Sequence, residues 1–198
     1  AYQAANALVA AGLVIATGGD PAATFDGLTR LQPVRGRLER AALNRAGAPV
    51  YVDYAHTPDA LEAAIAALRP HVSDSPRGRL IVVFGAGGDR DQGKRAEMGR
   101  VAAERADITI VTDDNPRGED PAAIRRQVLD GAVGAREIGD RRAAIAAAIA
   151  LAQAGGLVRV AGQGHEQGQI VGSGATRKIL PFDDVSVARE AAAAGVSA

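Results

Sequence analysis

The stretch LIVVFGAGGDRDQGKR, residues 80–95, joins an apolar run of five residues to a polar loop that is rich in glycine. A continuous apolar run of this length is typical of a strand that is buried on both faces of a parallel sheet. In the loop, residues 88–94 have the spacing G-x-x-x-x-G-K of a phosphate-binding loop, but Arg95 stands where that motif needs Ser or Thr for Mg²⁺. Asp89 and Asp91 also place negative charge where a phosphate would lie. We therefore expect a ligand loop or a tight strand-to-helix turn rather than an ATP-binding loop.

The alternation of strand and helix patterns continues on both sides of this stretch. Apolar and β-branched runs predict strands at residues 49–53, 80–84, 108–112, 135–138 and 157–161. Capped, alanine-rich segments predict helices at residues 3–16, 58–68, 95–105, 121–131, 140–154 and 184–194. Residues 169–172 and 177–180 are expected to pair as a hairpin. The repetition predicts an α/β fold, with a Rossmann-like, mostly parallel sheet, helices on both faces and an antiparallel edge hairpin.

Composition argues against several classes of protein. The chain has 198 residues with 23 basic and 23 acidic side chains, whereas nucleic acid and anionic membranes favour a basic excess, so we expect neither partner. The absence of cysteine excludes disulfides and fits a cytoplasmic protein. The apolar start lacks a basic region and is too short to span a membrane. Because ATGGDPAATFDG reads as a loop, we assign residues 1–30 to a preceding unit and residues 31–198 to the sheet domain.

Four polar loops follow the predicted strands, at the edge where parallel sheets bind their ligands. They read DYAHTPD, GAGGDRDQGK, DDNPR and GQGHE in chain order. Arg117 offers a planar fork for a carboxylate, and Asp114 and Asn115 can accept from an ammonium group, so this loop suits an amino acid. Glu166 can take an ammonium group, and Asp53 ends a strand where a ribose hydroxyl is often bound.

Each of these loops also has a purely structural interpretation. Asn115-Pro116 is a common turn, and Thr57 with Pro58 is a common helix start. A single histidine such as His165 more often has a structural role. The three histidines of the chain do not have the spacing of a zinc site, so we expect no bound metal.

Taken together and in this order, the motifs resemble those of the Mur ligases, the ATP-dependent amino acid ligases of peptidoglycan synthesis. The resemblance begins with AYQAANALVAAG and ends with LPFDDVSVARE, passing through GRLE, VDYAHTPDALE, FGAGGDRDQGKR, TDDNPR and GQGHE. DNPR is similar to the motif of the branch that adds meso-diaminopimelate rather than lysine. Gln3 and Gln163 depart from the pattern, since the family usually has Asn and Lys there.

The resemblance implies that residues 31–198 are the C-terminal domain of such a ligase and that residues 1–30 are the tail of its central ATP-binding domain. The phosphate loop, the Mg²⁺ ligands and a carbamylated lysine would belong to the central domain. We therefore expect no catalytic residue in this chain and no activity from it alone. In the whole enzyme, ATP with Mg²⁺ would activate UDP-MurNAc-L-Ala-D-Glu, the amine of meso-diaminopimelate would attack, and ADP and phosphate would leave.

The resemblance also assigns residues to two subsites. The nucleotide subsite would contain Asn6, Arg37, Asp53 and His56. The diaminopimelate subsite would contain Arg90, Asp114, Asn115, Pro116, Arg117, Gly162 and Glu166. Two alternatives stay open: another ligase of the superfamily, such as folylpolyglutamate synthase, and a non-catalytic Rossmann-like module that only binds an amino acid or a nucleotide.

Overall fold

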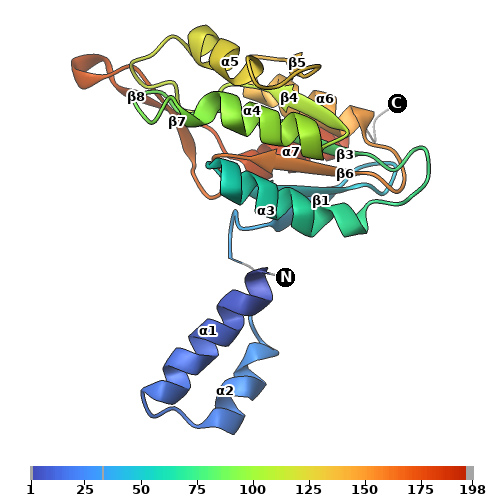
Figure 1. Cartoon of the computed structure of the whole chain (residues 1–198), viewed down its shortest axis with the longest axis vertical. Coiled ribbons are helices and arrows are strands. Elements are labelled where there is room, and N and C mark those ends of the chain that lie inside the picture. Colours follow the sequence, from blue (N-terminus) through green and yellow to red (C-terminus); the bar gives the residue numbers. More distant parts are fainter. Residues whose placement is uncertain (1, 33, 195–198) are drawn as a thin grey trace. The chain divides into compact units, whose positions relative to one another are not determined.

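The computed structural model describes residues 2–32 and 34–194, which form two compact units, Ala1–Val34 and Arg35–Ala198. The first unit contains α1 (Tyr2–Ala16) and α2 (Pro21–Leu28) (Figure 1). The expectation of a loop across residues 16–27 was wrong, because α2 occupies most of it. The side chain of Asp20 accepts a hydrogen bond from the Ala23 amide at 2.8 Å, and Pro21 begins the helix, so both common start signals are present.

The second unit is built on a six-stranded sheet, and its predicted α/β class is confirmed. In spatial order the strands are β1 (Glu39–Leu43), β2 (Pro49–Asp53), β6 (Leu157–Ala161), β3 (Leu80–Phe84), β4 (Ile108–Val111) and β5 (Arg136–Glu137). All neighbouring pairs are parallel except β1 with β2. The five residues of β3 are fully buried, as their continuous apolar run predicts.

Helices cover both faces of this sheet (Figure 1). One face carries α3 (Pro58–Leu68), extended by a short 3-10 turn, η1 (Arg69–His71), together with α4 (Lys94–Arg105) and α5 (Pro121–Leu129). The other face carries α6 (Arg141–Leu151) and α7 (Asp184–Ala194). The reason is topological: after α6 the chain returns to the middle of the sheet, and a right-handed crossover in that reversed direction lies on the opposite face.

Two apolar cores result, one on each face, and the side chains of a single strand are shared between them. Leu80, Val82 and Phe84 pack against α3, α4 and α5, whereas Ile81 and Val83 pack against α6 and α7. This alternation holds the strand ends in place and fixes the directions in which their loops leave the sheet.

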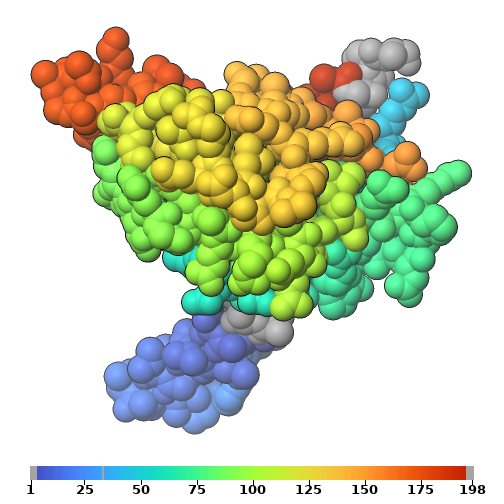
Figure 2. All heavy atoms as spheres, turned by 45° about the horizontal axis from the view of Figure 1, so that its top comes forward, coloured from blue at the N-terminus to red at the C-terminus, as the bar shows by residue number. Residues whose placement is uncertain are grey.

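The predicted hairpin is confirmed as β7 (Gly168–Val171) and β8 (Lys178–Pro181), separated by the 3-10 turn η2 (Gly174–Thr176). It forms a two-stranded sheet of its own and projects from the rest of the unit (Figure 2). The antiparallel edge of the main sheet is instead β1, which sequence patterns did not predict. Its sequence ERAAL lacks β-branched residues, and pairing with β2 makes it a strand.

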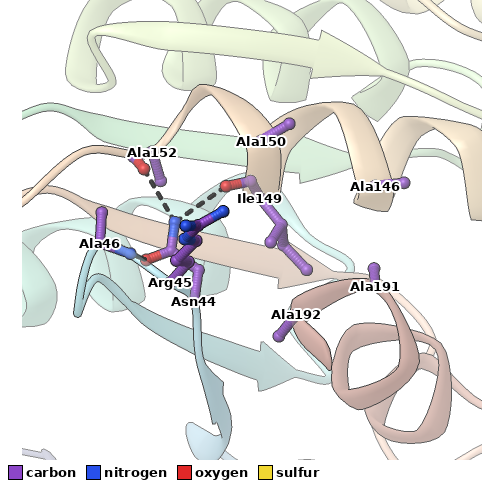
Figure 3. A pocket seen from close by; sticks show the side chains of 9 residues that line it. All are labelled: Asn44, Arg45, Ala46, Ala146, Ile149, Ala150, Ala152, Ala191 and Ala192. Atoms are coloured by element: carbon purple, nitrogen blue, oxygen red, sulfur yellow. Dashed lines mark hydrogen bonds between the residues drawn. The ribbon is translucent and has the colours of Figure 1, made fainter. Parts of the chain in front are cut away.

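The turn between β1 and β2 is fastened by Asn44. Its side-chain amide donates to the carbonyl oxygens of Ile149 and Ala152 at 2.9 and 2.8 Å, at the end of α6 (Figure 3). Its side-chain oxygen accepts from the amides of Ala46 and Ala48 at 3.0 and 2.9 Å. Asn44 also lines a pocket of about 450 Å³ between the turn, α6 and α7.

None of the helices in residues 2–32 and 34–194 combines the length and the apolar character that a membrane crossing requires.

Candidate functional site

The loops that follow β2, β3, β4 and β6 meet at the carboxyl edge of the sheet and surround a cleft of about 440 Å³. Because these four strands are parallel and adjacent, their polar loops must leave the sheet on the same side. Among the residues singled out from the sequence, the cleft is lined by His56, Arg90, Asp114, Asn115, Arg117, Gly162 and Glu166. The structure thus brings seven of them to one place, whereas their roles toward a ligand remain predictions.

Asn115 connects three loops of the cleft. Its side-chain amide donates to Glu166 Oε2 at 2.8 Å, and its side-chain oxygen accepts from the Ile170 amide at 2.7 Å. Its backbone carbonyl accepts from the Gly88 amide at 2.8 Å. Asn115 is buried, and both polar atoms of its side chain bond to the protein. Its evident role is to hold Glu166 and the hairpin in position, so an ammonium group would have to share its oxygen.

Arg117 lies across the loop that follows β3. Its Nη1 donates to the carbonyl oxygens of Gly88 and Asn115 at 3.0 and 3.3 Å. Gly87 permits this approach, because a Cβ there would come within 2.7 Å of Nη1. The Arg117 backbone has a φ of 50° and donates to the Ile170 carbonyl at 3.0 Å, which ties it to the hairpin. The guanidinium is therefore held at the wall of the cleft.

Asp114 is the buried carboxylate of the cleft. Its Oδ1 accepts from the Asn115 amide at 2.6 Å, and Gly162 lies directly opposite. Gly162 has a φ of 118°, and a Cβ at this position would come within 2.4 Å of Asp114 Oδ2. Burial raises the pKa of Asp114 above its ordinary value, and the positive charge of Arg141 opposes that rise.

The loop after β3, which carries Arg90, is held in place by Arg95. The Arg95 side chain is fully buried, and its Nη2 donates to the Gly87 carbonyl at 3.0 Å. The same guanidinium pairs with Glu119, whose Oε1 accepts from the Asp89 amide at 2.6 Å. The position that would bind Mg²⁺ in a phosphate loop thus holds a buried arginine. Arg90 itself is exposed and lines the cleft.

Lys94 is a residue of the cleft that sequence reasoning set aside. Its Nζ donates to the His56 carbonyl at 2.8 Å, so it links the loops after β2 and β3. Partial burial lowers its pKa, and Asp91 and Asp114 oppose that effect. Its position in the glycine-rich loop could have indicated a role in the cleft. We set the residue aside together with the phosphate-loop interpretation.

Beside the cleft, aromatic rings gather around Tyr54, another residue that the sequence analysis missed. The Arg37 guanidinium carbon lies 4.6 Å from the centroid of the Tyr54 ring. The rings of His56 and His165 lie 4.7 and 4.9 Å from the same ring. A cation and several rings in contact form a surface that suits a planar heterocycle and its phosphates.

Asp53 and Asn6 are two further residues that were expected at a nucleotide. Asp53 is 4% exposed, pairs with Arg159 at 2.8 Å and accepts from the Leu38 amide at 3.2 Å. Both of its carboxylate oxygens therefore bond within the protein. Asn6 lies exposed on α1, in the first unit.

Pro116, which was assigned to the diaminopimelate subsite, is buried, and its carbonyl packs so closely on Gly88 that a Cβ there would come within 1.8 Å.

Within the described part of the chain, no three His, Cys, Asp or Glu side chains are grouped so that they could hold a metal ion.

A doubly wound α/β unit with a charged cleft at the carboxyl edge of its sheet defines a ligand-binding domain of the Rossmann-like class. Within that class, the chain belongs to the family described as "Mur ligase, glutamate ligase domain", whose model matches residues 36–164. The sequence-based identification of the family is confirmed.

Two curated relatives share one description. A UDP-N-acetylmuramoyl-L-alanyl-D-glutamate–2,6-diaminopimelate ligase of Zymomonas mobilis is 65% identical over 190 residues, which cover 96% of this chain and 38% of the relative. The ligase of the same name from Caulobacter vibrioides is 58% identical over 186 residues, covering 94% of this chain and 37% of the relative. The chain thus spans about two fifths of the length of the curated relatives that it matches.

Solved structures agree on the fold. The structure of a protein with that same name has a TM-score of 0.74 and 38% identity, covering 96% of this chain and 38% of the other. A bifunctional folylpolyglutamate synthase/dihydrofolate synthase of Yersinia pestis has a TM-score of 0.54 and 22% identity, covering 70% of this chain and 31% of the other. At that identity the second likeness shows the fold alone.

Proposed function

We propose that this chain is the C-terminal domain of a cytoplasmic ATP-dependent ligase of the MurE type, which adds meso-diaminopimelate to UDP-MurNAc-L-Ala-D-Glu in peptidoglycan synthesis. One observation carries the proposal: a single cleft combines Arg90 and Arg117 with Asp114 and Glu166. The names of the relatives and the DNPR motif support it. Residues 1–30 would be the tail of the central domain that precedes this one.

The charges of the cleft match those of the amino acid. meso-Diaminopimelate has two ammonium and two carboxylate groups, so it requires donors and acceptors in one site. Arg90 and Arg117 would take the carboxylates, and Asp114 and Glu166 would take an ammonium group. Lysine lacks the distal carboxylate and would leave an arginine unpaired in a closed site, which disfavours it.

The nucleotide would lie toward the surface around Tyr54. Arg37, His56 and Asn6 would contact it, and Asp53 would reach a ribose hydroxyl only by sharing its bond to Arg159 or to the Leu38 amide. ATP would supply the phosphoryl group that activates the acceptor carboxylate. The ligands of Mg²⁺ would come mainly from the preceding domain, as the family resemblance implies.

The role left to this chain is delivery of the attacking amine. Its cleft would orient the amino acid, and closure over the preceding domain would bring the amine to the activated carboxylate and exclude water. The isolated chain would bind the amino acid and would be inactive as a ligase.

Calorimetry tests this proposal directly. The 198-residue chain is titrated with meso-diaminopimelate, L-lysine and L-glutamate, each with and without ADP. We expect meso-diaminopimelate to bind about tenfold or more tightly than lysine, as one extra charge-assisted bond requires. A preference for glutamate would favour a folylpolyglutamate synthase-like ligase and would overturn the proposal. A second test uses a longer protein that contains the preceding domains. If it binds meso-diaminopimelate but forms no amide bond, the alternative of a non-catalytic binding module would be favoured instead.

A further inference from the structure

Directly behind the cleft lies a fully buried ion pair that the sequence analysis did not identify. Arg141 begins α6, and Asp184 begins α7 on the same face of the sheet. Nε and Nη2 of Arg141 donate to Oδ1 and Oδ2 of Asp184 at 2.8 and 2.7 Å. Both side chains are 0% exposed. Stability alone does not explain such a buried ion pair, because apolar side chains of similar volume often give equal stability.

The same guanidinium also bonds to two loops of the cleft. Its Nη2 donates to the carbonyl of Ala161 at 2.9 Å, one residue before Gly162. Its Nη1 donates to the carbonyl of Asp113 at 3.2 Å, one residue before Asp114. In the sheet, β3 lies between β4 and β6, so strand pairing does not join these two loops. Arg141 joins them directly.

The two loops that Arg141 joins approach each other closely at Gly162 and Asp114. Gly162 faces Asp114 with no room for a side chain, so a small change in loop spacing changes the space beside this carboxylate. Four charged side chains from four segments act on Asp114: Arg141 of α6, Asp184 of α7, Lys94 of α4 and Glu166 of the loop after β6. Arg141 is the main cation that opposes the effect of burial.

We propose that Arg141, oriented by Asp184, is the positioning residue of the ammonium subsite: it sets the spacing of the Asp114 and Gly162 loops and supplies the positive charge behind the Asp114 carboxylate. This inference rests on the proposed function, because the subsite is the one that would hold the amine-bearing carbon of the amino acid. The pair is therefore more than a link between two helices. It lowers the pKa of Asp114 against the effect of burial without itself touching the ligand.

Two single substitutions separate this role from a merely structural one, because they change the charge behind Asp114 in opposite directions. Arg141→Gln removes the positive charge, so the pKa of Asp114 rises and binding of meso-diaminopimelate is lost at a higher pH. Asp184→Asn removes a negative charge, so the pKa of Asp114 falls and binding extends to a lower pH. We expect about a tenfold change in affinity for each unit of pKa shift, within the range where Asp114 titrates.

The measurements are carbon NMR titration of the Asp114 carboxyl group in the ligand-free chain and calorimetry with meso-diaminopimelate between about pH 4 and pH 8. Arg142→Gln serves as the matched control, since Arg142 neighbours Arg141 and its exposed pair with Glu190 also links α6 to α7. This control should leave both readouts unchanged.

Shifts of the same sign in both single variants, or affinity losses that do not depend on pH, would overturn the inference. If a single variant fails to fold, the double variant Arg141→Gln/Asp184→Asn leaves no buried charge unpaired. It should still raise the pKa of Asp114, because Arg141 acts on this group more strongly than Asp184 does. Failure of the wild-type chain to bind meso-diaminopimelate would count against the proposed function, whereas the NMR titration without ligand would still decide the role of Arg141.

Discussion

Arg95 holds both carboxylate oxygens of Glu119, with Nη1 2.8 Å from Oε2 and Nη2 2.8 Å from Oε1. Through this pair the loops after β3 and β4 become one body, because Glu119 also accepts from the Asp89 amide and Arg95 also donates to the Gly87 carbonyl. Arg95, which stands where a phosphate-loop motif requires Ser or Thr, thus stabilises the loop that carries Arg90.

The first prediction concerns acid stability. The hydrogen bond from Arg95 lowers the pKa of Glu119 from 4.5 to about 2. Because the folded-state pKa is depressed, the contribution of Glu119 is complete above pH 4.5 and is lost as the pH falls toward 2. Glu119→Gln should lower the free energy of unfolding at pH 7 by about 2 kcal/mol and flatten its decline in acid. Urea unfolding at several pH values measures this, with exposed Glu97→Gln as the control. An unchanged acid profile in Glu119→Gln would contradict the prediction.

The second prediction concerns the room beside Asp114. Gly162→Ala should weaken binding of meso-diaminopimelate by about tenfold or more, because the added methyl group displaces the Asp114 carboxylate. Gly47→Ala is the matched control, since Gly47 also has a positive φ, of 80°, but open space around it. Both variants should lose about 1 kcal/mol of stability through backbone strain. Equal affinities for the amino acid in the two variants would show that the close approach is unimportant.

The third prediction concerns selectivity. Arg117→Ala should reduce the preference for meso-diaminopimelate over lysine, because the fork for the distal carboxylate is removed. Arg117→Lys should restore only part of it, since an ammonium group cannot make two parallel bonds. Competition calorimetry measures the ratio of affinities, and Arg136→Ala, exposed on the edge strand β5, is the control. Undiminished discrimination in Arg117→Ala would remove Arg117 from the amino acid subsite.

The fourth prediction concerns stability remote from the cleft. Asn44→Ala removes four hydrogen bonds (Figure 3): two join the β1–β2 turn to the end of α6, and two hold the turn itself. We expect a loss of about 2–3 kcal/mol in the free energy of unfolding with unchanged affinity for the amino acid. Exposed Gln153→Ala, in the neighbouring turn, should have no effect. A loss of amino acid binding in Asn44→Ala would mean that the turn and the cleft are coupled.

Much of the fold could be predicted because its signals are local. The apolar run at residues 80–84 was recognised as a buried strand, and the run LVRVA at residues 157–161 as a strand, without knowledge of their neighbours in the sheet. Helix starts such as Thr57-Pro58 and Asp120-Pro121 carry their own caps. The strand β1 and the helix α2 were missed for different reasons. β1 depends on its neighbour β2, whereas the capping signal at Asp20-Pro21 was present but outweighed by the surrounding glycines.

The candidate site was predicted as a set of loops, and its internal contacts were not. Their order along the chain and the parallel sheet together predicted that they meet. Which polar atoms bond to one another could not be predicted, because partners such as Asn115 and Glu166, or Asp53 and Arg159, lie 51 and 106 residues apart. Tyr54 and Lys94 were recognised as residues of the site only from their contacts in the structure.

The sequence by itself determined the class of fold, the family and the list of charged residues at the carboxyl edge of the sheet, since periodicity, caps and short motifs are properties of neighbouring residues. Only the tertiary structure decided how those charges are used. It paired Arg95 with Glu119 and Arg141 with Asp184 beneath the loops, and left Arg90, Asp114 and Arg117 at the cleft. The physical reason is burial: a charge taken out of water must find a partner, and folding brings that partner from a distant part of the chain.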